Sequence, residues 1–310
     1  MTLLSGSTVT DENRPLWLAT KMETLGASEI GAALNLNPHY SPLELYLHKT
    51  GELERGEPTE EMEWGLRLES AVLSHYCQRN SAIVSATQVY LRHATLPISA
   101  TLDALVFRTD SPRSRVAEVK TIGAWSRLGL DEKDPETLPD TWQLQVQTQL
   151  LLSRDLLSAD EADVPVLVGG QRYKQWIGLP YKPDVIDAML PRAEEFWARV
   201  VDRNPPAPTR ATDASLMCAL YPEAHGEIAM DIAHAMVAEQ YFAASAEKNR
   251  QEEIAKRLKA ELEAILAGRE FGILPDGDKI KRSVWDVKAA VIQRKAYKAS
   301  KLTLQKASDR

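Results

Sequence analysis

The spacing of apolar residues changes along the chain between the periods typical of helices and of strands. Over 64–76, apolar residues stand at 64, 68, 71, 72 and 76, on one face of a helix. Over 101–107 they form a short, nearly continuous run that is typical of a strand. Such patterns predict helices over 28–34, 41–50, 64–76, 142–153 and 184–201, and strands over 101–107, 115–121, 164–168 and 173–179. Since helices and strands are mixed, we expect an α/β (α+β) fold with a mixed central sheet flanked by helices.

Two of the predicted strands are separated by a run of turn-forming residues. The run is Asp110-Ser111-Pro112-Arg113-Ser114, which predicts a β-hairpin between strands 101–107 and 115–121. The number of residues in the hairpin loop decides which side chains of the two strands share a face.

The amino-acid composition of the chain changes near the proline-rich segment 204–208, and such a segment is typical of a linker. Beyond it, 233–266 has the pattern of one long amphipathic helix, with Gly268 as a plausible stop. We therefore expect a first domain over 1–225 and a helical C-terminal extension over 226–310. We interpret the long helix as packing on the first domain. For the basic tail, contact with DNA or a partner and simple solvation are equally good interpretations.

Composition narrows the class of protein. Of the 310 residues, 44% are hydrophobic and 26% charged, which excludes a disordered or fibrous chain. Two cysteines, Cys77 and Cys218, are too few for a disulfide framework, a four-cysteine zinc site or an iron–sulfur cluster. Residues 1–20 have no signal-peptide pattern, and no apolar run approaches the ~18 residues of a membrane helix. We expect a cytoplasmic protein with no membrane partner.

The net charge of −7 at first argues against a nucleic-acid partner, because phosphate-binding proteins are commonly basic. The charge is unevenly distributed, however. Ten basic and two acidic residues give 279–310 a charge of +8, so 1–278 carry −15. The charge of the whole chain is therefore a poor guide to its partners.

Three acidic residues stand in apolar surroundings. Glu69 lies among apolar neighbours on the predicted helix over 64–76, and Asp103 lies within an apolar strand. Glu118 and Lys120 are two residues apart on a strand, so both point to one face. Each of these features also has an ordinary explanation. Glu69 could be a carboxylate at the edge of a helical stripe, and Asp103 could be an acid at a strand end. Glu118 and Lys120 could form a surface ion pair.

The combination indicates a metal site. With an even hairpin loop, Asp103 lies on the face of Glu118 and Lys120, about opposite Lys120; an odd loop would place it on the other face. Carboxylate oxygens suit Mg²⁺ or Mn²⁺, and Glu69 could add a third carboxylate. This set is typical of metal-assisted phosphodiester hydrolysis, in which Lys120 would orient the attacking water or help to deprotonate it.

At these residues the sequence resembles the PD-(D/E)xK nuclease superfamily, and within it the YqaJ-like viral recombinases, relatives of lambda exonuclease. The resemblance covers about 14–210 and includes several motifs in order. They are Gly26-Ala27-Ser28-Glu29-Ile30, Ser41-Pro42-Leu43-Glu44-Leu45-Tyr46, Trp64-Gly65-Leu66-Arg67-Leu68-Glu69, Asp103 with Glu118-x-Lys120, and Gln145-Val146-Gln147-Thr148-Gln149-Leu150. The resemblance implies a restriction-endonuclease-like core.

The resemblance also implies a role for each matching residue. Asp103 and Glu118 would bind the metal, Lys120 would serve the attacking water, and Glu69 would support the site as a further acid. Gln145 would orient Lys120 or the scissile phosphate.

The resemblance further implies recognition of a DNA end. Ser28 would bind the terminal 5′-phosphate. The related exonuclease has an arginine seven residues before this serine, where the present chain has Lys21, preceded by Trp17. Lysine keeps the charge but loses the bidentate fork, and Arg14 is an alternative donor.

The activity implied is that of an Mg²⁺-dependent deoxyribonuclease, with Mn²⁺ as a substitute, that digests linear double-stranded DNA 5′ to 3′ for phage-type recombination. Its expected partners are double-stranded DNA ends, a single-strand annealing protein and further copies of itself in a trimeric ring, in the cytoplasm of a bacterium or a phage-infected bacterium. The alternatives are a PD-(D/E)xK endonuclease, a helicase-associated repair nuclease, and a catalytically inactive DNA-end-binding protein.

Overall fold

The computed structural model describes residues 4–109, 113–124, 126, 128–286 and 302. The chain forms two compact units, Met1–Leu220 and Tyr221–Arg310, and each is described by itself. The division follows Leu220, whereas composition placed it after residue 225.

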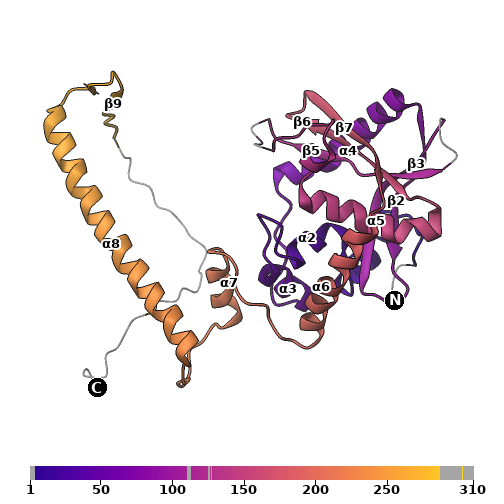
Figure 1. The fold of residues 1–310 in the computed structure, drawn as a ribbon, viewed down its shortest axis with the longest axis horizontal. Coiled ribbons are helices and arrows are strands. Elements are labelled where there is room, and N and C mark those ends of the chain that lie inside the picture. Colours follow the sequence, from indigo (N-terminus) through magenta and orange to yellow (C-terminus); the bar gives the residue numbers. More distant parts are fainter. Residues whose placement is uncertain (1–3, 110–112, 125, 127, 287–301, 303–310) are drawn as a thin grey trace. The chain divides into compact units, whose positions relative to one another are not determined.

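The first unit contains a seven-stranded mixed sheet (Figure 1). Its main path runs through β1 (Leu25–Gly26), β3 (Ile98–Arg108), β4 (Ser114–Ala117), β6 (Glu161–Val168) and β5 (Lys120–Ile122), while β2 (Ala82–Arg92) pairs with β3 and β7 (Arg172–Pro180) pairs with β6. The pairs β2–β3, β3–β4 and β6–β7 are antiparallel, and β1–β3, β4–β6 and β5–β6 are parallel. The mixed sheet confirms the predicted α/β class.

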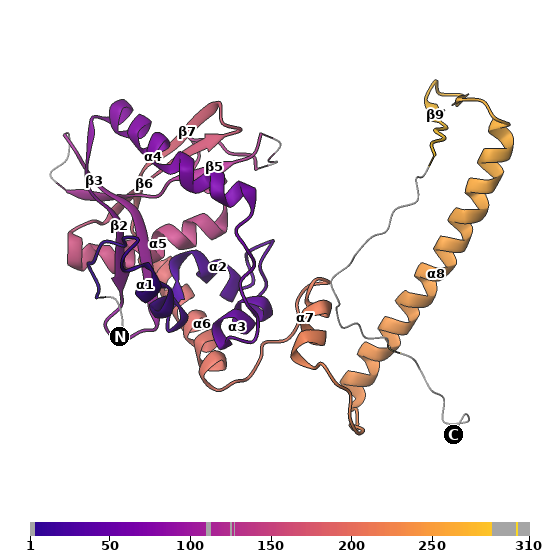
Figure 2. The same ribbon diagram turned by 180° about the vertical axis from the view of Figure 1, so that it is seen from behind.

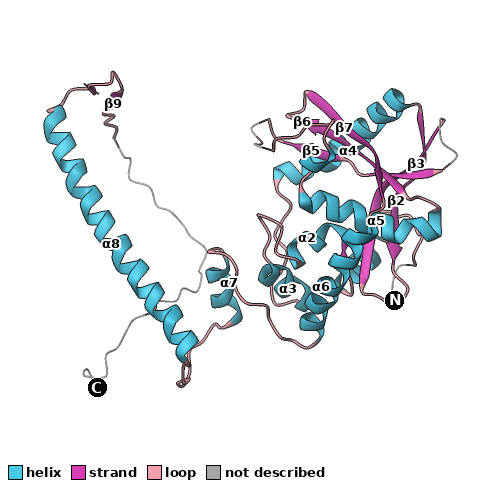
Figure 3. Ribbon diagram, in the orientation of Figure 1, coloured by secondary structure: helices cyan, strands magenta, loops and turns pink. Residues whose placement is uncertain are grey.

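Helices cover both faces of this sheet (Figures 2 and 3). The helices of the first unit are α1 (Arg14–Met22), η1 (Ala27–Glu29), α2 (Ile30–Ala33), α3 (Pro42–Thr50), α4 (Glu60–Asn80), η2 (Pro135–Thr137), α5 (Asp140–Leu157), α6 (Pro183–Val201) and α7 (Asp213–Leu220), the last of which contacts α3 and lies away from the sheet. Local signals set several ends. Ser41 and Thr59 accept backbone N–H bonds at the starts of α3 and α4, and Gly51 ends α3 with φ 75°.

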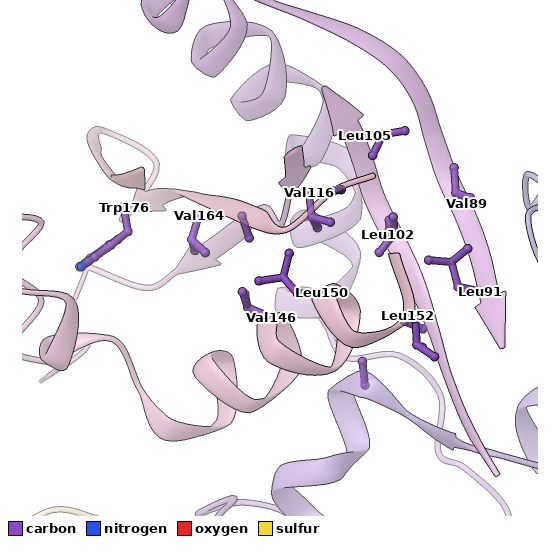
Figure 4. Close-up of a cluster of buried hydrophobic side chains, with 14 of the residues drawn as sticks. Val89, Leu91, Leu102, Leu105, Val116, Val146, Leu150, Leu152, Val164 and Trp176 are labelled. Carbon is purple, nitrogen blue, oxygen red and sulfur yellow. The ribbon is translucent and has the colours of Figure 1, made fainter. Parts of the chain in front are cut away.

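The core is divided between the two faces of the sheet. On one face Val146 and Leu150 of α5 pack against Leu102, Val116 and neighbouring apolar side chains (Figure 4). On the other face α4 packs against β3 and β4, through Val72, Leu73, Tyr76, Ala104, Val106 and Ala117. Helices α4 and α5 are therefore anchored over the strands that carry Asp103 and Glu118.

The strand predicted over 115–121 is interrupted. It forms β4 and β5, which pair in succession with β6, and Glu118 and Val119 lie between them. The register Phe107↔Ser114 leaves six residues in the hairpin, so the loop is even and Asp103 lies on the face of Glu118. The same register directs Asp103 toward Glu118, so the expectation that it lies opposite Lys120 was wrong by two residues.

Several short elements were absent from the predicted set, and two of the missed elements border the candidate site. One is α1 and the other is β2, the long partner of β3. Strand β2 contains a register shift between Val84 and Ala86 and a left-handed residue, Gln88, with φ 52°. These irregularities bend the strand across β3 and bring Gln88 to α4.

The second unit contains the long helix α8 (Ile232–Leu266), in close agreement with the predicted 233–266, and a hairpin of β8 (Phe271–Ile273) and β9 (Lys279–Lys281). The stripe expected to be buried is mostly exposed, since within α8 only Leu266 is buried. Most of the basic tail, from 287 onward, lies outside the described residues. None of the described helices combines the length and apolar composition needed to cross a bilayer.

Candidate active site

A cleft of about 320 Å³ opens beside β3 in the first unit. Its walls come from α1, the segment before α2, α4, β2, β3 and α5. The lining residues are Trp17, Lys21, Gly26, Ala27, Ser28, Leu66, Glu69, Gln88, Ser99, Ala100, Thr101, Asp103 and Gln145. Residues far apart in the sequence, including five of the predicted site residues, therefore share one concave surface.

Asp103 is held by the interruption between β4 and β5. The backbone N–H of Val119 donates to Asp103 Oδ2 at 2.8 Å. A continuous strand would use this N–H in its own ladder, so the break frees a donor for the carboxylate. Glu118 N–H remains paired, with the carbonyl oxygen of Asp163 at 3.0 Å. The local irregularity therefore aims Asp103 at the cleft while Glu118 stays anchored to β6.

Both oxygens of Glu118 accept hydrogen bonds from side chains. Its Oε1 accepts from Lys120 Nζ at 2.6 Å and from Gln145 Nε2, and its Oε2 accepts from Gln149 Nε2 at 2.5 Å. Lys120 Nζ also donates to Gln145 Oε1 at 2.9 Å. With 2% of its surface exposed, the Glu118 carboxylate is buried, and these donors supply the hydrogen bonds that water would otherwise make. Gln145 lines the cleft and contacts both Lys120 and Glu118, so these two side chains lie next to the cleft behind Gln145.

Glu69 reaches the same site from α4. Gln88 Nε2 donates to Glu69 Oε1 at 2.9 Å and fixes the direction of its carboxylate. One helical turn earlier, Gly65 lies against β5, where a Cβ atom would stand 3.2 Å from Thr121 Oγ1. A glycine at 65 therefore lets α4 approach the sheet closely enough for Glu69 to face the site.

The carboxylates interact strongly. Burial raises the pKa of Asp103 well above its usual value, and the charges of Glu118 and Glu69 raise it further, against the opposing effects of Lys120 and the Val119 N–H. Burial also raises the pKa of Glu69, and Glu118 adds to this, while the bond from Gln88 lowers it. The negative charge of the three carboxylates at this site is therefore larger than the single positive charge of Lys120 can offset.

This donor set fits a hard divalent cation. Asp103 and Glu118 supply carboxylate oxygens on one face, Glu69 is a further acid, and a cation would relieve their mutual repulsion. Within the described part of the chain, no three His, Cys, Asp or Glu side chains stand close enough to form a metal site unaided. Asp103 and Glu118 are therefore the residues that could hold an ion, with the remaining ligands coming from water or substrate.

The cleft also carries two of the residues expected to bind a phosphate. Ser28 is exposed on the lining, and Lys21, which also lines the cleft, has its Nζ 4.6 Å from the centre of the Trp17 ring. The indole of Trp17 is fixed by a bond to Thr101 Oγ1 at 3.0 Å. Arg14 lies over Trp17, 5.6 Å from the ring centre, and does not line the cleft.

A buried ion pair lies behind Ser28. Lys49 Nζ contacts Glu29 Oε2 at 2.6 Å and donates to the carbonyl oxygens of Lys21 and Thr24, each at 2.7 Å. Glu29 also accepts from the Gly26 N–H at 2.8 Å and from Arg55. The pair ties the end of α1 to the segment that carries Ser28.

The structure thus brings Asp103, Glu118, Lys120, Gln145 and Glu69 together, with Ser28 and Lys21 in the same cleft. Two contacts were missed. Gln149 follows Gln145 by one helical turn, so the i,i+4 spacing could have indicated it. Gln88 lies on β2, which was not predicted, and no local signal pairs it with Glu69.

Comparison with known proteins identifies relatives. The family described as "YqaJ-like viral recombinase domain" matches residues 16–154. An uncharacterised protein YqaJ of Bacillus subtilis (strain 168) is 26% identical over 269 residues, which are 84% of this chain and 81% of that protein.

Solved structures resemble part of the chain. An alkaline exonuclease (LHK-Exo) from Laribacter hongkongensis is similar over 63% of this chain and 94% of its own, with TM-score 0.49 and 16% identity. A phage-related exonuclease from Haemophilus somnus 129PT is similar over 58% of this chain and 96% of its own, with TM-score 0.45 and 10% identity.

Proposed function

We propose that the protein, whose residues 16–154 match the YqaJ-like viral recombinase domain family, is a metal-dependent DNA exonuclease of phage-type recombination. It digests one strand of linear double-stranded DNA, 5′ to 3′, and leaves single-stranded DNA. The observation that carries this proposal is the convergence of Asp103, Glu118 and Lys120 beside one cleft. Two carboxylates and an ammonium so placed suit phosphodiester hydrolysis.

The proposed cofactor is Mg²⁺, for which Mn²⁺ can substitute, held by Asp103 and Glu118. When bound, such an ion neutralises phosphate charge and lowers the pKa of a water. Glu69 adds negative charge that favours the cation at this position. The buried surroundings of Glu118 limit competition from bulk water and strengthen these electrostatic interactions.

Lys120 and Gln145 act on the reacting groups. The ammonium of Lys120 lies between Glu118 and Gln145, which hold it at the site. There it orients the attacking water and stabilises the charge that develops on the phosphate. The amide of Gln145 lines the cleft and positions both Lys120 and the scissile phosphate.

The partners follow from this activity. The substrate is a double-stranded DNA end, the product is passed to a single-strand annealing protein, and the protein assembles as a ring-shaped homotrimer in the bacterial cytoplasm. Ser28 and Lys21 receive the terminal 5′-phosphate. Arg14, which lies over the Trp17 ring, contributes charge rather than a direct contact.

Digestion of linear but not circular DNA tests the proposed activity. We expect a linear duplex to be degraded from its ends with Mg²⁺ and to be spared when EDTA removes the ion, because the carboxylates of Asp103 and Glu118 without a cation repel the negatively charged phosphate. Covalently closed circular DNA serves as the matched substrate without ends. Gel electrophoresis that showed cutting of the closed circle would favour the endonuclease alternative.

End recognition is tested with 5′-phosphorylated and 5′-hydroxyl ends on the same duplex. We expect the phosphorylated end to be digested faster, and Ser28→Ala to reduce this preference by about tenfold, since a hydrogen bond to a charged group is lost. Ser215→Ala, an exposed serine on α7, should keep the wild-type preference. Equal rates on both ends in the wild-type protein would contradict the assignment of Ser28.

A further inference from the structure

Gln149 lies on α5 one turn beyond Gln145, with none of its surface exposed. Its Nε2 donates to Glu118 Oε2 at 2.5 Å. Lys120 and Gln145 both bind the other oxygen, Oε1. Among the described side chains, Gln149 is therefore the donor to Oε2.

The other end of this amide has no compensating contact. Gln149 Oε1 is buried and has no hydrogen-bond partner in the described part of the chain. An unsatisfied buried carbonyl destabilises a fold by about 1–3 kcal/mol, whereas a leucine of similar size would pack on α5 without a polar atom. Packing alone would therefore favour an apolar residue at this position. What the amide of Gln149 contributes instead is its hydrogen bond to Glu118.

Gln147 shows what a buried amide with a purely structural role looks like. It lies on the same helix, is also buried, and uses both ends of its amide. Its Nε2 donates to the Pro180 carbonyl oxygen at 2.9 Å, and its Oε1 accepts from Lys182 N–H at 2.7 Å. In Gln149, by contrast, Nε2 donates to Glu118 and Oε1 has no hydrogen-bond partner among the described residues.

We propose that Gln149 is a positioning residue for Glu118, and that it fixes the carboxylate so that the site binds a divalent cation tightly. The inference rests on the proposed function. With Oε2 held by Gln149, the plane of the carboxylate is set even when Lys120 moves with substrate. Without Gln149, Glu118 is held through Oε1 alone and can rotate away from Asp103.

The test compares Gln149→Leu with Gln147→Leu in the full chain. Binding of Mn²⁺ without DNA is followed by the electron paramagnetic resonance of free Mn²⁺, and thermal unfolding by circular dichroism. We expect Gln149→Leu to weaken Mn²⁺ binding by about 10- to 100-fold, as for other residues that orient metal ligands, with a Tm close to that of the wild type, because removal of the unpaired Gln149 Oε1 offsets the loss of the donor to Glu118 Oε2. Gln147→Leu should lower Tm and leave Mn²⁺ affinity as in the wild type.

A second variant, Gln149→Met, covers the case in which leucine misfolds, since methionine keeps the length without the amide. Wild-type Mn²⁺ affinity in a folded Gln149→Leu or Gln149→Met protein would overturn the inference. Glu118→Gln separates this failure from a failure of the proposed function. If Glu118→Gln loses Mn²⁺ while the Gln149 variants keep it, the site stands and the positioning role falls; if Glu118→Gln also keeps it, both fall.

Discussion

Replacement of Glu118 by glutamine is expected to reduce hydrolysis of linear DNA by at least about a hundred- to a thousand-fold, while DNA binding changes little. The substitution keeps the size of the side chain but removes a charge that would hold the cation. It also replaces one of the two acceptor oxygens by an NH2 donor, so the amide cannot accept from Lys120 and Gln145 on one side and from Gln149 on the other. The set of hydrogen bonds that holds Lys120 and Gln145 around residue 118 is therefore broken at one side.

Steady-state cleavage and a DNA-binding titration in EDTA, run on the same preparation, measure the two effects. Glu195→Gln is a suitable control, because Glu195 is an exposed carboxylate on α6 that pairs with Arg199, one helical turn away on the same helix. It should behave as the wild type. Retention of more than a tenth of the activity in Glu118→Gln would show that the metal site has been assigned to the wrong residue.

Replacement of Lys49 by methionine is expected to destabilise the first unit by about 3–5 kcal/mol, because it removes the buried cation of the pair and leaves the buried Glu29 carboxylate to Arg55, whose side chain is half exposed. The carbonyl oxygens of Lys21 and Thr24 also lose their donor. For a unit of this size the loss corresponds to a fall in Tm of roughly 6–20 °C.

The exposed pair Arg67–Glu63 provides the control. It has a similar N–O distance of 3.0 Å, but both side chains are about half exposed or more. Arg67→Met should therefore change stability by less than about 1 kcal/mol. If Lys49→Met and Arg67→Met unfolded at the same temperature, the buried pair would not stabilise the segment that carries Ser28.

The same ion pair predicts a direction for acid sensitivity. Burial alone would raise the pKa of Glu29, but the charges of Lys49, Lys21 and Arg55 and the bond from Lys49 outweigh it, so the pKa is lowered. Stability from this group is present above the unfolded pKa of about 4.3 and is lost as pH falls below it.

Much of the fold was predictable because its elements are marked locally. The helices α3, α4, α5 and α6 and the strands β3, β6 and β7 lie where apolar periodicity placed them, and caps such as Ser41 and Gly51 set the ends of α3. β2 and α1 were missed, although both contribute to the cleft through Gln88, Trp17 and Lys21. The irregular pairing of β2 and β3 is a property of two strands together, and neither strand's sequence displays it.

The candidate site also has a part that the sequence could predict and a part that depended on the tertiary structure. By themselves, the residues 103, 118 and 120 and their strand period indicated that two carboxylates and an ammonium could share a face, and motif order indicated the family. The tertiary structure alone decided that Asp103 faces Glu118, that Val119 N–H is diverted to Asp103, and that Gln149 holds the second oxygen of Glu118. Side-chain direction along a strand follows from its period of two, which a sequence contains, whereas a break in pairing and contacts between distant elements depend on packing of the whole unit.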